Sequence, residues 1–486
     1  MRLLWLFGWI GCLAFGCSSD RTGGGFPEDS SSGSRDAVSR TYYVSPQGSD
    51  ARSAGEARNE TTPWRTIQKA ADAITGGDTV VILSGTYHEQ VVLGPRCSGT
   101  EESPTLFVAR EKGRVVIDDG HDGVSEQFAS VFKIDNARHI KIEGLQVINS
   151  RWFGFSVNDC AYIEITECST DNTRASGIYV AYADHITITN NHIKKACQEN
   201  ERDSHGWGSQ ECITVSRTND FKISGNEVWG STVDGNAGGE GIDAKGGSCN
   251  GEISYNYIHD IVPLAIYVDA GSGESSNIRV FCNRAIDTGG FAIAGELGGY
   301  AHHVYFYNNV IVNSRLSGFV FQNIMNGKYT DVYLVNNTFY NNNRTGGFGG
   351  DIGNYSTNAE NRNLVIRNNI FYNKTGNSRF SIWHNVAAPH VIDHNLYYDF
   401  KASYSSEGNH FTLENLTASD LVGQDPLFVD GSSYDFELQA SSPAIGRAEP
   451  VLRPGSTELL FETDFSGKSR GSDQWDLGAF EYFGDH

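Results

Sequence analysis

A short segment in the middle of the chain carries an amine and a carboxylate on one face of a predicted strand. Within residues 240–245, Ile242 and Ala244 alternate with Asp243 and Lys245, and this period of two is that of a β-strand. The same alternation occurs at residues 211–216, 264–269 and 291–296. A rigid strand that presents an amine beside a carboxylate can hold both groups in place for acid–base chemistry.

Parallel stacking of these four strands predicts columns of side chains on their outward face. One column is expected to contain Ser216, Lys245, Asp269 and Glu296. The next column is expected to contain Thr214, Asp243, Tyr267 and Ala294. Because a lysine would stand there among carboxylates and a tyrosine, this face is the predicted site of chemistry.

The composition indicates a β-rich protein with many turns. The chain has 486 residues, 55 of them glycine and only 2 methionine, and a formal net charge of -22. Such an acidic chain offers no basic stripe for phosphates, so nucleic acid is not an expected partner. An anionic substrate would need a cation or local basic groups to offset this charge.

An asparagine that follows a short apolar strand recurs along the chain. Asn191 and Asn226 are 35 residues apart, and Asn283 and Asn309 are 26 residues apart. Asparagine can turn the chain in the left-handed region and bond to its copies in neighbouring coils. The repeat therefore predicts an all-β fold, a right-handed parallel β-helix over residues 40–428. A propeller or a sandwich fits such regular steps poorly.

Both ends of the repeat carry segments of a different kind. Residues 64–74 have the period of an amphipathic helix, which resembles the helix that caps the first coil of many parallel β-helix proteins. Such a plug is needed because the first coil would otherwise expose its core and unpaired strand edges. Residues 429–486, where the repeat fades, resemble a C-terminal segment of exported β-helix proteins and are predicted to form a cap.

The first residues have the pattern of an export signal. Arg2 precedes an apolar run over residues 3–15 that is too short to span a bilayer. The run ends before Cys17 in a sequence that resembles a bacterial lipoprotein box. This resemblance implies cleavage and lipidation at Cys17, a leader at residues 1–17 and anchoring at the outer membrane or cell surface. An ordinary secretory signal is the alternative. Residues 18–39 are predicted to form a flexible tether.

Seven cysteines follow Cys17, and an exported protein can form disulfides between them. Cys197 with Cys212 is the first candidate pair and Cys160 with Cys168 the second. Buried thiols are the alternative. Spacings typical of zinc sites are absent from the sequence.

The segment Glu240-Gly-Ile-Asp-Ala-Lys245 resembles the Glu-x-Ile-x-x-Lys signature of the β-helix polysaccharide lyases of the alginate lyase and chondroitin B lyase type. The resemblance implies that Glu240 binds calcium and that Lys245 removes the C5 proton of a uronate. Calcium would offset the uronate carboxylate and make that proton acidic enough to remove. The family's arginine falls at Tyr267, and its second glutamate falls at Gly238.

These substitutions leave roles open for other residues of this chain. Tyr267 is a candidate general acid, and further candidate calcium ligands are Glu211, Asp243 and Asp269. Candidate substrate-binding residues are Tyr179, His205, Trp207 and Glu296, in which an aromatic ring would suit a sugar face. The expected partner is an acidic polysaccharide, the expected cofactor is Ca²⁺, and the protein is expected to be a monomer that meets a membrane only through its lipid anchor.

Two other functions fit the same sequence. A glycoside hydrolase could use Asp243, Asp269 and Glu296 as acid and base, with Lys245 expendable. A non-catalytic, surface-held glycan-binding protein would need only the aromatic residues. Fold cannot decide among them, because β-helices host lyases, hydrolases and adhesins. At the level of single residues, Lys245 could also be a surface lysine paired with Asp269.

Overall fold

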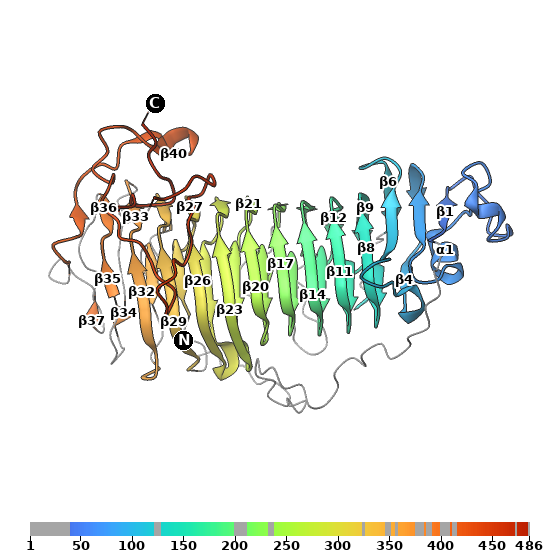
Figure 1. Ribbon diagram of the computed structural model, residues 1–486, viewed down its shortest axis with the longest axis horizontal. Coiled ribbons are helices and arrows are strands. Elements are labelled where there is room, and N and C mark those ends of the chain that lie inside the picture. The colour runs from blue at the N-terminus through green and yellow to red at the C-terminus, as the bar shows by residue number, and fades with distance from the viewer. Residues whose placement is uncertain are drawn as a thin grey trace.

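The chain winds in successive coils around one long axis, and each complete coil adds a strand to three parallel sheets (Figure 1). This architecture is the predicted right-handed parallel β-helix. The computed structural model describes residues 39–120, 128–198, 211–231, 238–322, 326–345, 351–354, 358–374, 383–384, 391–398, 409–410, 416–471 and 474–484.

Two of the sheets contain 13 strands each among the described residues. Sheet A consists of β1 (Thr41–Val44), β2 (Thr79–Ile82), β5 (Thr105–Ala109), β8 (Arg138–Glu143), β11 (Ala161–Thr166), β14 (Asp184–Thr189), β17 (Asn219–Ser224), β20 (Cys249–Ser254), β23 (Glu274–Phe281), β26 (Tyr300–Tyr307), β29 (Lys328–Val335), β32 (Arg362–Arg367) and β35 (Val391–Asp393). Sheet B consists of β3 (Gly85–Tyr87), β6 (Val115–Asp118), β9 (Leu145–Ser150), β12 (Ser169–Thr173), β15 (His192–Lys194), β18 (Glu227–Trp229), β21 (Tyr257–His259), β24 (Arg284–Ile286), β27 (Val310–Val312), β30 (Thr338–Tyr340), β33 (Ile370–Tyr372), β36 (Leu396–Tyr398) and β38 (Leu421–Val422).

The third sheet, sheet C, contains 10 strands in the described part and carries the segments singled out in the sequence. It consists of β4 (Val91–Leu93), β7 (Ser130–Asp135), β10 (Phe153–Asn158), β13 (Ile178–Ala181), β16 (Ile213–Ser216), β19 (Ile242–Lys245), β22 (Ile266–Asp269), β25 (Phe291–Ala294), β28 (Phe319–Phe321) and β31 (Ile352–Asn354). Two small antiparallel pairs lie outside the coils: β34 (Trp383–His384) with β37 (Asn409–His410), and β39 (Phe428–Asp430) with β40 (Asp435–Leu438).

The interior of the coils is filled by apolar columns that follow the register of the sheets. In sheet C, Ile213, Ile242, Ile266 and Phe291 are register partners on successive strands, and all four are fully buried. Each such side chain contributes about 1.5–3 kcal/mol through burial. The inward residues fix which side chains face outward, because neighbours along a strand point to opposite faces.

A buried ladder of asparagines joins the coils at one corner, as the sequence repeat predicts. Asn283 Nδ2 donates to Asn309 Oδ1 at 3.0 Å and to the Ile253 carbonyl at 2.8 Å. Asn283 Oδ1 in turn accepts from Asn256. The same contacts run through Asn191, Asn226, Asn256, Asn283, Asn309, Asn337, Asn369 and Asn395.

The predicted amphipathic helix forms as α1 (Ile67–Ala73) at the first coil (Figure 1). Thr66 caps it by accepting from Lys69 N, and Glu89 accepts from the first two amides, Ile67 N and Gln68 N, at 2.9 Å. Ile67 and Ala70 are fully buried against the first coil. Because these side chains shield the end of the core, α1 acts as the predicted plug.

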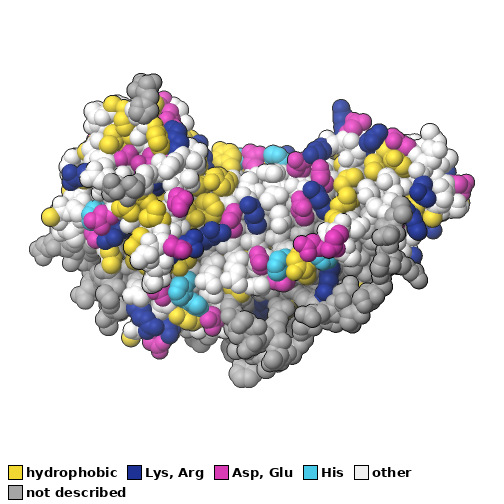
Figure 2. Space-filling model, viewed as in Figure 1, with side chains coloured by type: hydrophobic (Ala, Val, Ile, Leu, Met, Phe, Trp, Pro, Cys, Tyr) yellow, Lys and Arg dark blue, Asp and Glu magenta, His cyan; other side chains and the backbone are white. Residues whose placement is uncertain are grey.

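The C-terminal residues 428–471 and 474–484 pack along the side of the later coils of sheets A and B. Phe436, Leu460 and Trp475 belong to a buried cluster with Val310 and Ile370 of sheet B. In Figure 1 part of this segment forms the lobe that rises at the C-terminal end of the solenoid, and the dark red part crosses in front of the later coils. On the face shown in Figure 2, basic and acidic side chains are interspersed rather than gathered by sign.

The predicted disulfides are wrong for the residues that the structure describes. Cys160 and Cys168 are both buried thiols, which agrees with the alternative prediction. The thiols of Cys197 and Cys212 contact each other without forming a bond. The leader, including Cys17, lies outside the described residues. Within the described part, no helix has the length and apolar character needed to cross a bilayer.

Candidate active site

Sheet C brings the predicted site residues together in two outward columns. The first column contains Ser216, Lys245 and Asp269 on successive strands, and the second contains Thr214, Asp243 and Tyr267. Both columns were predicted up to this point.

The next strand, β25, differs from the prediction by two residues. Asp269 pairs with Ala294 and Tyr267 pairs with Ala292, so Ala294 belongs to the first column rather than the second. Glu296 lies beyond β25 in a short 3₁₀ turn, outside both columns. It nevertheless reaches the site from this turn, as its contact with Tyr267 shows.

Lys245 is held by carboxylates at the end of β19. Its Nζ lies 2.5 Å from Glu211 Oε1 and 3.7 Å from Asp243 Oδ2. The second oxygen of Glu211 accepts from Thr214 Oγ1 at 2.8 Å, so Glu211 is fixed at both oxygens. The expected alternative, a surface lysine paired with Asp269, is wrong, because Lys245 is only 24% exposed and its ion pairs are with Glu211 and Asp243.

The carboxylates around Lys245 repel one another, and Glu211, Asp243 and Asp269 are buried while Glu240 is half-buried. Asp243 is 2% exposed, and its Oδ1 atom has no hydrogen-bond partner. Burial, the Glu211 charge and the Asp269 charge raise its pKa well above the usual range. Burial and Glu211 raise the pKa of Glu240 to about 7, and burial and Glu296 raise that of Asp269 to about 8. Burial acts to lower the pKa of Lys245, but Glu211 and Asp243 raise it overall.

Tyr267 and Glu296 form a second polar pair next to this cluster. The Tyr267 hydroxyl donates to Glu296 Oε1 at 2.6 Å. Burial and the nearby Asp269 and Glu296 charges raise the pKa of Tyr267, which keeps the phenol protonated. Asp269 Oδ1 accepts from Gly271 N at 2.7 Å and from Glu296 N at 3.0 Å, and this fixes the turn that carries Glu296.

The donor set suits a hard cation such as Ca²⁺, which binds oxygen ligands. Asp243 Oδ1 is a buried carboxylate oxygen without a partner, and Glu240, Asp243 and Asp269 are the remaining candidate ligands, since Glu211 is already fixed at both oxygens. In the part of the chain that the structure describes, no three His, Cys, Asp or Glu side chains converge on one point as metal ligands. Calcium would therefore need further oxygens, from water or from substrate.

An aromatic wall lies beside the charged cluster. Tyr179 on β13 is the register partner of Thr214, and its ring stacks on Phe153 with centroids 4.5 Å apart. This register places Tyr179 on the strand next to β16, at the edge of the charged cluster. His205 and Trp207 lie outside the described residues.

Sequence reasoning passed over Tyr182 and Arg217, which lie at the corner that follows these strands. Tyr182, Arg217 and Gly246 each come directly after the end of a strand, on three successive coils. The Arg217 guanidinium lies over the Tyr182 ring, 5.3 Å from its centroid. Counting one residue past the predicted column would have placed Arg217 opposite Gly246, the residue after Lys245.

Comparisons with known proteins agree with this class of fold. The family model described as "Pel9A-like, right handed beta helix region" matches residues 42–238. The uncharacterized protein YwoF of Bacillus subtilis (strain 168) is 26% identical over 465 residues, which cover 83% of this chain and 91% of YwoF.

Similar solved structures include the complex of XylC with xylose, at 12% identity and a TM-score of 0.59, which covers 91% of this chain and 98% of that one. Pectate lyase Pel9A covers 91% of this chain and 96% of its own at 17% identity and a TM-score of 0.47. At these identities the likeness concerns the fold. Polysaccharide lyases and glycoside hydrolases are both among the proteins with a similar fold.

Proposed function

We propose that this protein is a polysaccharide lyase that cleaves a uronic-acid polymer by calcium-assisted β-elimination, with Lys245 as the base. The observation that carries the proposal is the position of the Lys245 amine. It is fixed by Glu211 on the outward face of sheet C, among carboxylates that include one unpartnered oxygen of Asp243. Preorganised proton-transfer groups of this kind are what abstraction of a weakly acidic proton requires.

In the proposed reaction, Lys245 takes the proton at C5 while the bond from C4 to the glycosidic oxygen breaks. A double bond forms between C4 and C5, and the leaving oxygen takes a proton from Tyr267. The Tyr267 hydroxyl is protonated and donates to Glu296, so it would turn from Glu296 to the leaving oxygen as it gives up its proton. Glu211 orients the Lys245 amine through the 2.5 Å contact, so each group has a defined place before substrate binds.

Lys245 can act as a base only after it loses its own proton, and the surrounding carboxylates oppose this. A calcium ion bound by one or two of the candidate ligands Glu240, Asp243 and Asp269, with water and substrate oxygens completing its shell, would offset their charge and that of the uronate carboxylate. The proposal also places the protein outside the cytoplasm, anchored through Cys17, where an extracellular polysaccharide is accessible.

The test is to follow the ultraviolet absorbance of the unsaturated uronate while the protein, with calcium, meets alginate, pectate, chondroitin or dermatan. We expect absorbance to rise with one of these polymers. Lys245→Ala should lower the rate by about 10²–10⁴-fold, the usual contribution of a general base. Lys222→Ala is the matched control, because Lys222 is an exposed lysine paired with Glu252 on sheet A. Product formation that survives Lys245→Ala would remove Lys245 from the mechanism.

A glycoside hydrolase is the second candidate, and one observation favours it. Burial and Glu296 raise the pKa of Asp269 to about 8, which favours the protonated form that a general acid needs, and Asp243 or Glu296 would supply the second carboxylate. A hydrolase would yield new reducing ends without ultraviolet absorbance, and Asp269→Asn, rather than Lys245→Ala, would abolish them. If neither product forms, a glycan-binding protein is the remaining function.

A further inference from the structure

Arg217 is a cation at the edge of the candidate site that the proposed reaction does not yet use. Its backbone amide donates to the Lys245 carbonyl at 3.1 Å, so the two residues lie on adjacent coils. A Cβ atom built on Gly246, the residue after Lys245, would lie 4.0 Å from the Arg217 guanidinium carbon. The Arg217 guanidinium therefore lies next to the backbone of Gly246, one residue after the candidate base.

The guanidinium is oriented by an aromatic ring rather than by an acid. It lies over Tyr182, which is 50% exposed, and Arg217 itself is half-buried. Among the described residues, no carboxylate lies within ion-pair distance of Arg217, although the chain carries a net charge of -22. The positive charges of Lys245 and Arg217 both act to lower the pKa of the Tyr179 hydroxyl, against the larger effect of burial.

An arginine of this kind can recognise a carboxylate. The guanidinium offers two parallel N–H donors that match the two oxygens of a carboxylate, and contact with an aromatic face leaves those donors available. The carboxylates of Glu211 and Asp243 form their ion pairs with Lys245 and not with Arg217. An anion from solution can thus bind Arg217 without displacing an existing ion pair.

We propose that Arg217 binds the carboxylate of a uronate residue and that Tyr182 positions its guanidinium for this contact. The inference rests on the proposed function, because it names how the lyase site selects an acidic sugar.

The first experiment measures binding without turnover. In a Lys245→Ala background, calorimetry would compare the affinity for an oligouronide with that for its methyl ester. The oligouronide would come from the polymer that is cleaved, or from each of the four polymers if none is cleaved. Arg217→Gln should raise the Kd for the free acid about ten- to hundredfold, the usual effect of losing a charge-assisted hydrogen bond. Its effect on the ester should be small. Arg217→Lys should recover only part of the affinity, because an amine lacks the planar fork.

The second experiment uses Tyr182 and a control arginine. Tyr182→Leu removes the ring and should weaken oligouronide binding by a few-fold. Arg279→Gln is the matched control, because Arg279 lies 6.0 Å from the Phe281 ring on sheet A and is exposed. It should leave binding unchanged. A thermal melt of each variant checks that it folds.

The outcomes separate this inference from the proposed function. Loss of preference for the free acid in Arg217→Gln supports the inference, even if the wild-type protein releases no unsaturated product and the lyase proposal fails. The inference is overturned if the wild type releases unsaturated product and the Arg217→Gln variant keeps the wild-type KM and oligouronide binding. The lyase proposal would survive that result. Equal wild-type affinity for acid and ester also overturns the inference.

Discussion

The residues around Lys245 are not balanced in charge. Glu211, Asp243, Glu240 and Asp269 all lie close enough to shift one another's pKa or that of Lys245. Buried carboxylates without enough cations are costly, and they respond by holding protons or by binding a cation. As pH rises, these carboxylates are therefore expected to lose protons and bind a metal ion instead.

This exchange of protons for a metal ion makes the stability of the fold depend on pH and calcium. Glu240 and Asp269 have pKa values of about 7 and about 8, above their unfolded values, so their stabilising effect is present in acid and lost as pH rises through about 7–8. Without calcium, the Tm should fall between about pH 5 and about pH 8. Calcium should raise the Tm more at the higher pH, because it binds the ionised carboxylates.

Thermal melts with calcium and with a chelator measure both effects. Asp243→Asn should reduce the calcium response, because it removes the unpartnered carboxylate oxygen. Asp331→Asn on sheet A, where the Asp331 carboxylate is exposed, is the control and should keep the full response. A Tm that is independent of calcium at both pH values would contradict a metal site here.

Single residues of the site were predictable only where a register could be counted. Alternation placed Lys245, Asp243 and Tyr267 on one face, and equal strand lengths put them in columns. Glu296 was misplaced by two residues, and a shift of two keeps every side chain on the same face, so alternation cannot detect it. Arg217 lies at a corner, where no alternation operates.

The elements were predictable because every coil repeats the same requirement. A strand must bury one face, and the corner residue must turn the chain, so apolar alternation and asparagine recur together. The asparagine ladder follows from this repeat, since each copy stands above the last. The cysteine pairs were not predictable, because Cys160 and Cys168 fill interior positions that any small apolar residue could occupy.

The ladder itself can be tested at Asn283. Its side chain donates to Ile253 O and Asn309 Oδ1 and accepts from Asn256, all in the interior. Asn283→Ala should lower the free energy of unfolding by about 3 kcal/mol, because it leaves buried partners unsatisfied. Urea unfolding measures this loss. Asn59→Ala, which removes exposed contacts to Thr61, should cost less than about 1 kcal/mol. Equal costs would show that the ladder adds no stability.

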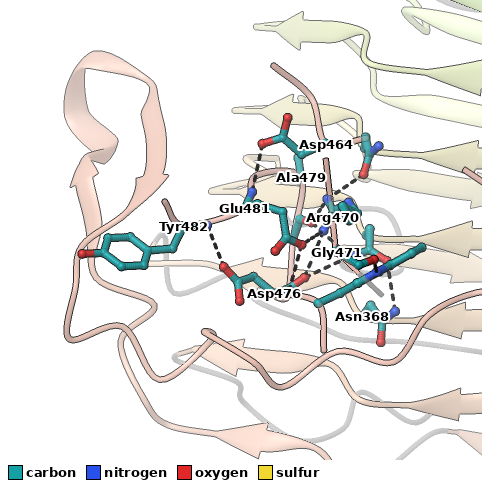
Figure 3. Close-up of polar contacts among 12 residues, drawn as sticks. Asn368, Asp464, Arg470, Gly471, Asp476, Ala479, Glu481 and Tyr482 are labelled. Atoms are coloured by element: carbon teal, nitrogen blue, oxygen red, sulfur yellow. Dashed lines mark hydrogen bonds and ion pairs between the residues drawn. The ribbon is translucent and has the colours of Figure 1, made fainter. Parts of the chain in front are cut away.

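For the whole molecule, the C-terminal segment is held to the coils by a buried ionic network (Figure 3). Arg470 is fully buried, with Nη1 at 2.5 Å from Glu481 Oε1 and Nη2 at 2.8 Å from Asn308 Oδ1 of the solenoid. Its guanidinium carbon lies 5.6 Å from the Phe461 ring centroid and 5.5 Å from that of Trp475. The segment thus docks on an outer asparagine of the repeat and covers apolar side chains of sheet B.

Breaking this network should loosen the segment without altering sheet C. Arg470→Gln leaves Glu481 buried without its cation, which costs about 3–5 kcal/mol, and adding Glu481→Gln should recover part of that loss. Limited proteolysis should then cleave within residues 428–484 faster, and a dye that binds apolar surface should report the uncovered face of sheet B. Arg453→Gln, an exposed arginine of the same segment, is the control. Lys245 and Arg217 lie on other coils and at another sheet, so the activity of each folded molecule should stay unchanged. A loss of activity that matches the proteolysis would instead show that the C-terminal segment helps to form the site.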